Sequence, residues 1–253
     1  MNTIKITVKD GIALLTLDYK KSNVIGSEMV MELKNMLQSI ENDDNIFGLI
    51  LTGKDDFFSA GLDFIELFDY SEEQIKYFWE QYFALIYQLT AFKKPLIAAI
   101  NGHAPAAGTV ISLCCDYRIM AEGEFQIGLN EVALGLIVPN SFFQLYASCI
   151  GTQKAHRFIL EGTLMFPQEA MDIGLVDEVG KQESVINLAV KQMKKYLQYN
   201  KLVWQETKLN LRKNLTFAVQ PHQPDIIKRI LEEWWAPYNR SILRTIIQNF
   251  KKN

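Results

Sequence analysis

KPLIAAINGHAPAAGTVISLCCDYRIMAEGEFQIGLNEVALGL, residues 94–136, is the stretch that decides the fold. Its pattern predicts a buried strand over 95–100, a turn over 101–105, a helix of small apolar residues over 106–115 and a second strand over 117–121. A helix that directly follows a buried strand leaves its first backbone N–H groups without helical partners. These groups face the turn together with the positive end of the helix dipole, so the turn is suited to bind a negatively charged or carbonyl oxygen.

Glu131 is the one carboxylate in the nearly uncharged segment that closes this stretch. A glutamate at the start of a helix is often a surface residue, but the flanking Gly128, Leu129 and Val132 are apolar and fit a solvated patch poorly. An amide-lined turn beside a single carboxylate suits the abstraction of a proton next to a carbonyl group. We therefore predict that Glu131 is a catalytic base.

The flanking segments predict an α/β fold. Residues 47–52 form a continuous apolar strand, the kind that is buried on both faces of a parallel sheet. Before it come two strands over 4–8 and 12–18, joined by a hairpin turn, and a helix that Ser27 is predicted to cap. Strand, helix and strand recur in this order up to residues 95–100, which indicates crossover connections and a largely parallel sheet.

The second half of the chain is mainly helical. A long helix over Glu72–Thr90 is crowded with aromatic residues, which either fill the core or form the wall of a site for a long apolar ligand. A short strand is predicted over 175–179, and only helical patterns follow from residue 201. We therefore divide the chain into a core domain with the site, residues 1–200, and a helical region, residues 201–253.

Composition excludes several classes of protein. The 253 residues are 49% hydrophobic and carry a net charge of −3, which argues against nucleic-acid binding by bulk electrostatics. Cys114 and Cys115 are adjacent in an apolar helix, which indicates buried reduced thiols and a reducing compartment. The N-terminus enters a strand pattern at once, and no apolar run reaches the roughly 18 residues of a membrane span. We expect a cytoplasmic protein without a membrane span.

Familiar cofactor and metal motifs do not occur in the sequence. It has no GxxxxGK[ST] phosphate loop, no GxGxxG dinucleotide fingerprint and no GxSxG nucleophile elbow. The histidines, His103, His156 and His222, are widely separated, so we predict no metal site. His103 lies in the turn of the organising stretch, where a loop histidine without a catalytic role is the simpler interpretation.

Four motifs in order resemble the crotonase, or enoyl-CoA hydratase/isomerase, superfamily. They are FFSAGLDF (57–64), AAINGHAPAAG (98–108), CDYRIMAEGEFQIGLNEVALGLIVP (115–139) and EAMDIGLVDEVG (169–180). The resemblance covers roughly residues 3–200. It implies a crotonase-like spiral of ββα units that forms two near-perpendicular sheets, with a C-terminal helical region for trimerisation. It further implies a homotrimer or a dimer of trimers.

The resemblance also implies the substrate and the site. The substrate is an acyl-CoA thioester, so coenzyme A arrives as part of the substrate and no other cofactor is expected. Carried over by motif, the backbone N–H groups of Ala60 and Ala107 form the oxyanion hole, where preorganised donors stabilise an enolate-like charge. Gly61 and Gly108 let the backbone bend towards a ligand. The remaining residues expected to bind substrate are Lys20, Leu62, Asp63 and Phe64, while Lys21 shares the early loop that passes the CoA phosphates.

The number of carboxylates at the expected site distinguishes between the possible reactions. Hydratases of the superfamily use two glutamates, and the position of the first is Val110 in this chain. One base suffices to move a double bond, and the segment around Glu131 resembles the 3,2-trans-enoyl-CoA isomerase type of fatty-acid oxidation. Asp63 is predicted to cap the following turn, and Glu66 remains a spare acid near the acyl chain. The alternatives are a hydratase with a displaced second acid, another crotonase-type enzyme, or a non-catalytic acyl-CoA-binding protein.

Overall fold

A six-stranded sheet carries the most deeply buried strands. The computed structural model describes residues 3–250; Met1, Asn2 and residues 251–253, at the outer ends of the two predicted domains, lie outside the described part. The first two strands are antiparallel, and every later neighbour is parallel. The strand order is β1 (Ile4–Lys9), β2 (Ile12–Leu17), β3 (Gly48–Thr52), β4 (Leu96–Ile100), β6 (Tyr117–Ala121) and β8 (Glu178–Gly180).

A second sheet is much smaller. It consists of β5 (Ala104–Pro105) and β7 (Ile127–Gly128), which are parallel, with single bridges from Phe57 to His103 and from Ile127 to Met165 at its sides. The turns of the chain that begin at β4 and β6 therefore each contribute one strand to the main sheet, one short strand to the small sheet and then a helix. This is the predicted α/β spiral of strand–strand–helix units.

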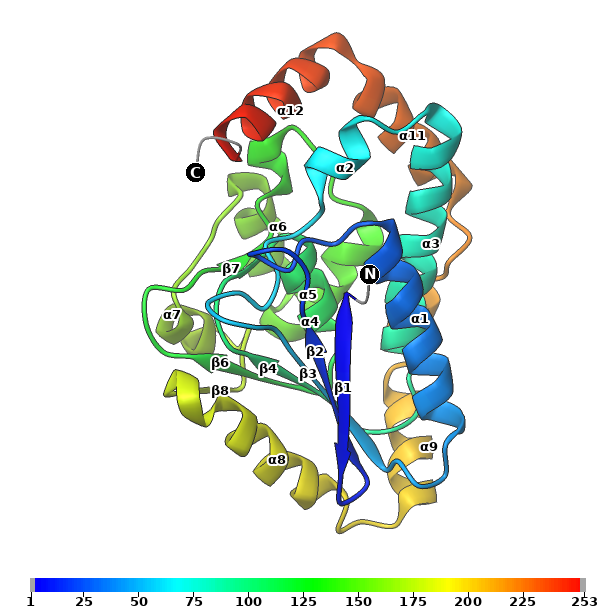
Figure 1. Cartoon of the computed structure of the whole chain (residues 1–253), viewed down its shortest axis with the longest axis vertical. Coiled ribbons are helices and arrows are strands. Elements are labelled where there is room, and N and C mark those ends of the chain that lie inside the picture. The colour runs from blue at the N-terminus through cyan, green and yellow to red at the C-terminus, as the bar shows by residue number, and fades with distance from the viewer. Residues whose placement is uncertain (1–2, 251–253) are drawn as a thin grey trace.

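Helices cover both faces of the main sheet (Figure 1). Val185, Ala189 and Met193 of α8 form a small core with one face, while α1, α3 and α4 enclose the larger core on the other face. Cys114 and Cys115 lie buried in this larger core as predicted. The helices of the core region are α1 (Ser27–Asn42), α2 (Phe64–Phe68), α3 (Glu72–Thr90), α4 (Ala107–Leu113), α5 (Asn140–Ile150), α6 (Thr152–Glu161), α7 (Pro167–Asp172) and α8 (Val185–Tyr196).

Helix α3 forms where the sequence predicts it. Ser71 and Gln74 make a capping box at its start, with the Ser71 hydroxyl accepting from the Gln74 amide and the Gln74 side chain accepting from the Ser71 amide. Its buried face carries Ile75, Phe78 and Tyr82 at helical spacing. Most of the aromatic side chains on this helix therefore pack into the core.

Two local predictions were wrong. Ser27 is the first residue of α1 rather than its cap: the N-cap is Gly26, and the amide of Ser27 donates to the carboxylate of Glu66 at 3.0 Å. The strand predicted over 175–179 begins only at Glu178. The amides of Leu175 and Val176 both donate to the carbonyl of Ala170, so they close the end of α7 and cannot join the sheet.

The C-terminal helices pack onto the core at both ends of the molecule. Helix α9 is held by Lys208, whose buried ammonium lies 2.7 Å from the Asp116 carboxylate and 2.9 Å from the carbonyl of Lys94. Figure 1 shows α11 and α12 at the opposite end, beside α3 and α2. No helix within residues 3–250 is long and apolar enough to cross a bilayer. The C-terminal helices are α9 (Lys201–Leu211), α10 (Lys213–Ala218), α11 (Pro224–Trp235) and α12 (Pro237–Phe250).

Candidate active site

A cavity of about 530 Å³ brings together the segments that the sequence singled out. Its lining includes the early lysine loop, the SAGLDF segment, the PAA turn and the segment around Glu131. Its volume lies in the range of small-molecule sites, and most of its lining side chains are apolar. Aromatic side chains of α3 and α11 line it as well. Of the aromatic residues on α3, which could fill the core or line a site, Trp79 and Tyr82 are buried and also line this cavity.

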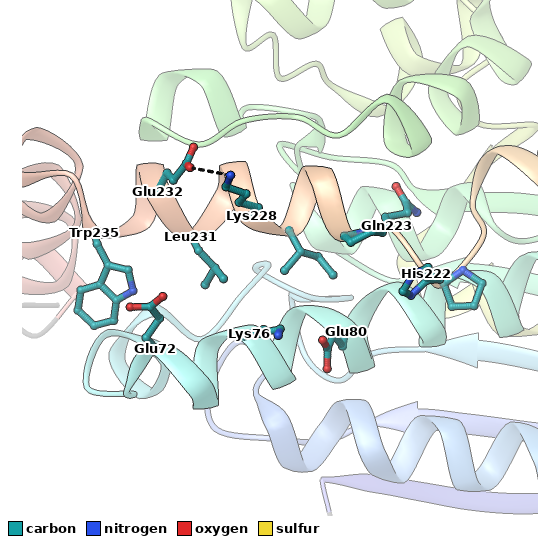
Figure 2. Close-up of a pocket in the computed structure, with 12 residues that line it drawn as sticks. Glu72, Lys76, Glu80, His222, Gln223, Lys228, Leu231, Glu232 and Trp235 are labelled. Carbon is teal, nitrogen blue, oxygen red and sulfur yellow. Dashed lines mark ion pairs between the residues drawn. The ribbon is translucent and has the colours of Figure 1, made fainter.

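A larger and more open groove of about 920 Å³ lies between α3 and α11. Figure 2 shows Glu72 and Trp235 at one end of this groove and His222 at the other. Along it, Lys228 pairs with Glu232 at 4.0 Å, on the solvent-facing side of α11. The groove lacks the turn amides and the buried carboxylate, so we place the chemistry in the smaller cavity.

The turn before α4 has a constrained backbone. Ala106 has φ +51° and ψ −118°, a conformation that L-residues rarely adopt and that costs about 1–3 kcal/mol. The carbonyl of Ala106 accepts the first helical bond, from Val110 at 3.0 Å. Within the described residues the N–H of Ala107, which lines the cavity, donates to no acceptor. Ala107 therefore offers the free amide that the sequence predicted.

The SAGLD loop corrects one prediction. The N–H of Ala60 donates to the carbonyl of Ser22 at 2.9 Å, so it is already used and is not free to bind a ligand oxygen. The amides of Gly61 and Asp63 are used too, by the Ser59 hydroxyl and by the carbonyl of Ile25. In this loop, as far as the described residues extend, only Leu62 keeps an unpaired N–H, and Leu62 also lines the cavity. Backbone hydrogen bonds between this loop and residues 22–25 determine which of its amides is free. A comparison of motifs does not reveal these bonds.

The two glycines hold the loop and the turn in contact. A side-chain carbon built on Gly61, whose φ is +96°, would lie 3.7 Å from the amide nitrogen of Ala107. One built on Gly108 would lie only 2.5 Å from the carbonyl oxygen of Ser59, closer than any real contact allows. Gly108 is therefore required by the approach of two backbones, and the free amides of Leu62 and Ala107 come from segments that touch.

Glu131 lies at the start of a short 3₁₀ helix, η1 (Glu131–Leu134). Its side chain is only 7% exposed, and Oε2 has no hydrogen-bond partner among the described residues. Burial raises the pKa of the Glu131 carboxyl to about 7, against a bond to its own backbone that lowers it. A carboxyl with a pKa near neutrality can both take and return a proton at physiological pH.

The other carboxylates of the region are already engaged. Asp63 pairs with Lys20 and caps α2 by accepting from the Glu66 amide at 3.2 Å, as predicted. Glu66 does not line the cavity, because its carboxylate binds the Ser27 amide and the Tyr70 hydroxyl. Val110 is fully buried. No second free carboxylate therefore faces Glu131 from the positions that the sequence considered.

Comparisons with known proteins agree with this geometry. Residues 7–241 match the enoyl-CoA hydratase/isomerase family. The chain belongs to that family. A Mus musculus protein named enoyl-CoA delta isomerase 1, mitochondrial, is 37% identical over 205 residues, which cover 80% of this chain and 71% of the mouse protein. A Bacillus subtilis protein named probable enoyl-CoA hydratase is 33% identical over 187 residues, covering 74% of this chain and 72% of that protein.

The fold of the enoyl-CoA hydratase/isomerase family is shared over nearly the whole chain. The crystal structure of human mitochondrial delta3-delta2-enoyl-CoA isomerase superimposes with a TM-score of 0.95 and 28% identity, covering 99% of both chains. The resemblance and the crotonase-like fold predicted from the four motifs are thereby confirmed. Members named for hydration and for isomerisation both resemble this chain, so family membership alone does not choose the reaction.

Several residues at the site escaped sequence analysis. Trp234 and Glu233 of α11 line the cavity, and so does Ile246 of α12. The sequence showed their helical periodicity but gave no signal of where these helices dock. His103, by contrast, accepts from the Gln126 amide at 3.2 Å and does not line the cavity, which favours the simpler interpretation of a loop histidine.

Proposed function

We propose that this chain is an isomerase that converts 3-enoyl-CoA into 2-trans-enoyl-CoA in fatty-acid oxidation. The observation that carries the proposal is a buried Glu131 carboxyl, whose Oε2 has no partner among the described residues, in the same cavity as Leu62 and Ala107 with their free amides. A carbonyl oxygen held between the two amides would place the neighbouring carbon for attack by a carboxylate.

The reaction needs only these groups. Glu131 removes a proton from C2, next to the thioester, and the electrons of that C–H bond form the dienolate. The amides of Leu62 and Ala107 hold the oxyanion, and each such donor lowers the barrier by about 3 kcal/mol in comparable sites. Glu131 then returns its proton to C4, so the double bond lies between C2 and C3 and the enzyme is regenerated without water or a cofactor.

The early lysine loop supports the acyl-CoA assignment. Lys20 and Lys21 line the cavity beside Asp63, and ammonium groups at a cavity rim attract phosphates. We propose that these lysines meet the phosphate-bearing part of coenzyme A. Leu62, Phe64 and Gly61 would then lie along the acyl thioester.

The main alternative is hydration, and one observation bears on it. Glu233 is the one cavity carboxylate besides Glu131 and Asp63 among residues 3–250, but it accepts from the Asn239 amide at 3.0 Å and belongs to an exposed residue. Adding water requires two groups to orient and activate it. A non-catalytic binding protein would gain nothing from burying an unpaired carboxyl at a desolvation cost.

The decisive experiment separates these reactions. Purified protein is incubated with 3-hexenoyl-CoA and, separately, with 2-hexenoyl-CoA, while the absorbance of the conjugated enoyl thioester is followed. We expect conjugation of the first substrate, no hydration of the second, and loss of conjugation in Glu131→Gln. Rapid hydration of 2-hexenoyl-CoA would refute the isomerase, and binding of both thioesters without turnover would favour the non-catalytic protein.

We further propose assembly into a homotrimer or a dimer of trimers, working in the cytoplasm. Large apolar side chains on α9 and α10 support an assembly, because Leu211 is 79% exposed and Phe217 is 76% exposed. Light scattering after size exclusion measures the mass, for which three or six copies of 29.1 kDa are expected. A monomer would refute this assembly.

Fractionation of cells tests the proposed cytoplasmic location, for which the mouse relative's name offers mitochondria as the alternative.

A further inference from the structure

Three residues that line the cavity each carry a buried hydrogen-bond donor without a partner. The donors are Nε1 of Trp79, the hydroxyl of Tyr82 and Nε1 of Trp234, and none meets an acceptor within residues 3–250. The three side chains are 5%, 1% and 1% exposed. Most buried polar atoms in folded proteins have a partner, so three such donors around one cavity call for an explanation.

The donors lie on two helices that face the same cavity. Trp79 and Tyr82 are three residues apart on α3, with their rings edge to face at 5.9 Å. Trp234 is on α11 and stacks on Phe64 at 6.4 Å, next to the loop that carries the free amide of Leu62. These ring contacts fix the positions of the aromatic side chains but supply no oxygen acceptor.

The chemistry of these groups restricts what could pair with them. An indole N–H can only donate, so two of the three groups require an acceptor atom. A plain hydrocarbon chain offers none and would leave both indoles buried and unpaired. An oxygen on the acyl chain would satisfy at least one of them.

The charges around the cavity indicate which oxygen fits. The cationic side chains in the lining are Lys20 and Lys21 of the early loop, and Lys20 is already paired with Asp63. Trp79, Tyr82 and Trp234 bring no positive charge, and Glu131 and Glu233 line the same cavity. A carboxylate buried here would lack a counter-ion, whereas a neutral oxygen needs only the N–H and O–H donors.

We propose that the acyl part of this cavity accepts a chain bearing a neutral oxygen acceptor, a keto or hydroxyl group, which the donors of Trp79, Tyr82 and Trp234 recognise. The inference rests on the proposed function, because it takes the acyl thioester as the ligand. It adds the class of acyl chain to that function.

Binding of saturated thioesters tests the inference without using turnover. Isothermal titration compares octanoyl-CoA with 5-oxo-, 6-oxo- and 7-oxooctanoyl-CoA, which match it in length and differ in the place of the oxygen. We expect at least one oxo chain to bind about tenfold more tightly than octanoyl-CoA, the worth of one well-placed bond. Equal or weaker binding of every oxo chain would overturn the proposal, because the donors would then serve water or packing only.

Variants locate the recognition. Trp79→Phe, Tyr82→Phe and Trp234→Phe each keep an aromatic ring and remove a donor, and at least one should reduce the preference for the oxo chain towards unity. Trp204→Phe is the matched control, because Trp204 packs on Tyr196 outside the cavity and should keep the full preference. A preference that survives in all three cavity variants would overturn the assignment to these donors.

The outcome is separable from that of the isomerase assay. An oxo-chain preference without conversion of 3-hexenoyl-CoA would leave the binding inference standing and refute the isomerase. Conversion of 3-hexenoyl-CoA together with equal binding of octanoyl-CoA and the three oxooctanoyl thioesters would support the isomerase and refute the binding inference.

Discussion

Gly61 and Ala107 belong to different turns of the spiral, yet a side-chain carbon on Gly61 would lie 3.7 Å from the amide nitrogen of Ala107. Leu62, the residue after Gly61, and Ala107 each keep an N–H without a partner among the described residues, and both residues line the same cavity. Two amides fixed by the backbone need no reorganisation when charge develops on a bound oxygen. The fold therefore supplies the polar half of the site without using a charged side chain.

The pH dependence of the rate should report Glu131. Only the ionised carboxylate can take a proton, and burial raises its pKa to about 7. We expect kcat/KM for 3-hexenoyl-CoA to fall about tenfold per pH unit below pH 7 and to be flat above it. Initial rates in a series of buffers measure this profile. A profile that stays flat down to pH 5 would show that another group is the base.

The same pKa predicts a change in stability. Glu131 binds its proton more tightly in the folded chain, with a pKa of about 7 against the ordinary 4.5, so folding favours the protonated form. The wild-type free energy of unfolding should therefore fall as the pH rises from about 4.5 to about 7, by roughly 3 kcal/mol from this group alone. Glu131→Gln should lack that fall and be the more stable protein at pH 8. Urea unfolding of the wild type and of Glu131→Gln at pH 5 and pH 8 tests these two expectations. The same change in the free energy of unfolding between the two pH values in both proteins would contradict the prediction.

Gly108→Ala should separate the two segments that carry the free amides of Leu62 and Ala107. The added methyl group would lie 2.5 Å from the carbonyl oxygen of Ser59, so the loop and the turn must separate. We expect a loss of about 1–3 kcal/mol in stability and a fall in kcat of about a hundredfold, because donors displaced by about 1 Å lose their alignment. Gly151→Ala is the control: it has open space but a φ of +83°, so it should lower stability and leave kcat unchanged. Equal kcat in both variants would argue against the contact.

Lys208 should hold the C-terminal helices onto the core. Its ammonium is buried 2.7 Å from the Asp116 carboxylate, so Lys208→Met leaves that carboxylate with Arg212 as its remaining ion-pair partner, at 3.2 Å, and with the Leu96 amide at 2.8 Å. We expect a loss of about 3 kcal/mol in the free energy of unfolding. Lys201→Met breaks an exposed pair with Asp44 and should cost less than about 1 kcal/mol. Chemical denaturation compares the two variants, and a similar loss in both would refute the role of burial.

Much of the fold followed from local pattern. The continuous apolar runs that became β3 and β4 are buried throughout, and α3 spans Glu72–Thr90 as predicted. Such signals are readable because period and capping depend on neighbours in the chain. Ser27 misled the prediction, since the helix begins at Ser27, after Gly26, and a distant carboxylate, Glu66, accepts from the Ser27 amide.

For the site, the sequence alone determined that Glu131 lies among apolar neighbours. That Gly108 is needed for the close approach of two backbones became clear only in the structure. Only the tertiary structure decided which amide of the SAGLD loop is free, because Ser22 and Ile25, more than thirty residues earlier, use those of Ala60 and Asp63. It also placed Trp234 at the cavity. A local pattern specifies which groups a segment carries, whereas their hydrogen-bond partners depend on segments that only folding brings into contact.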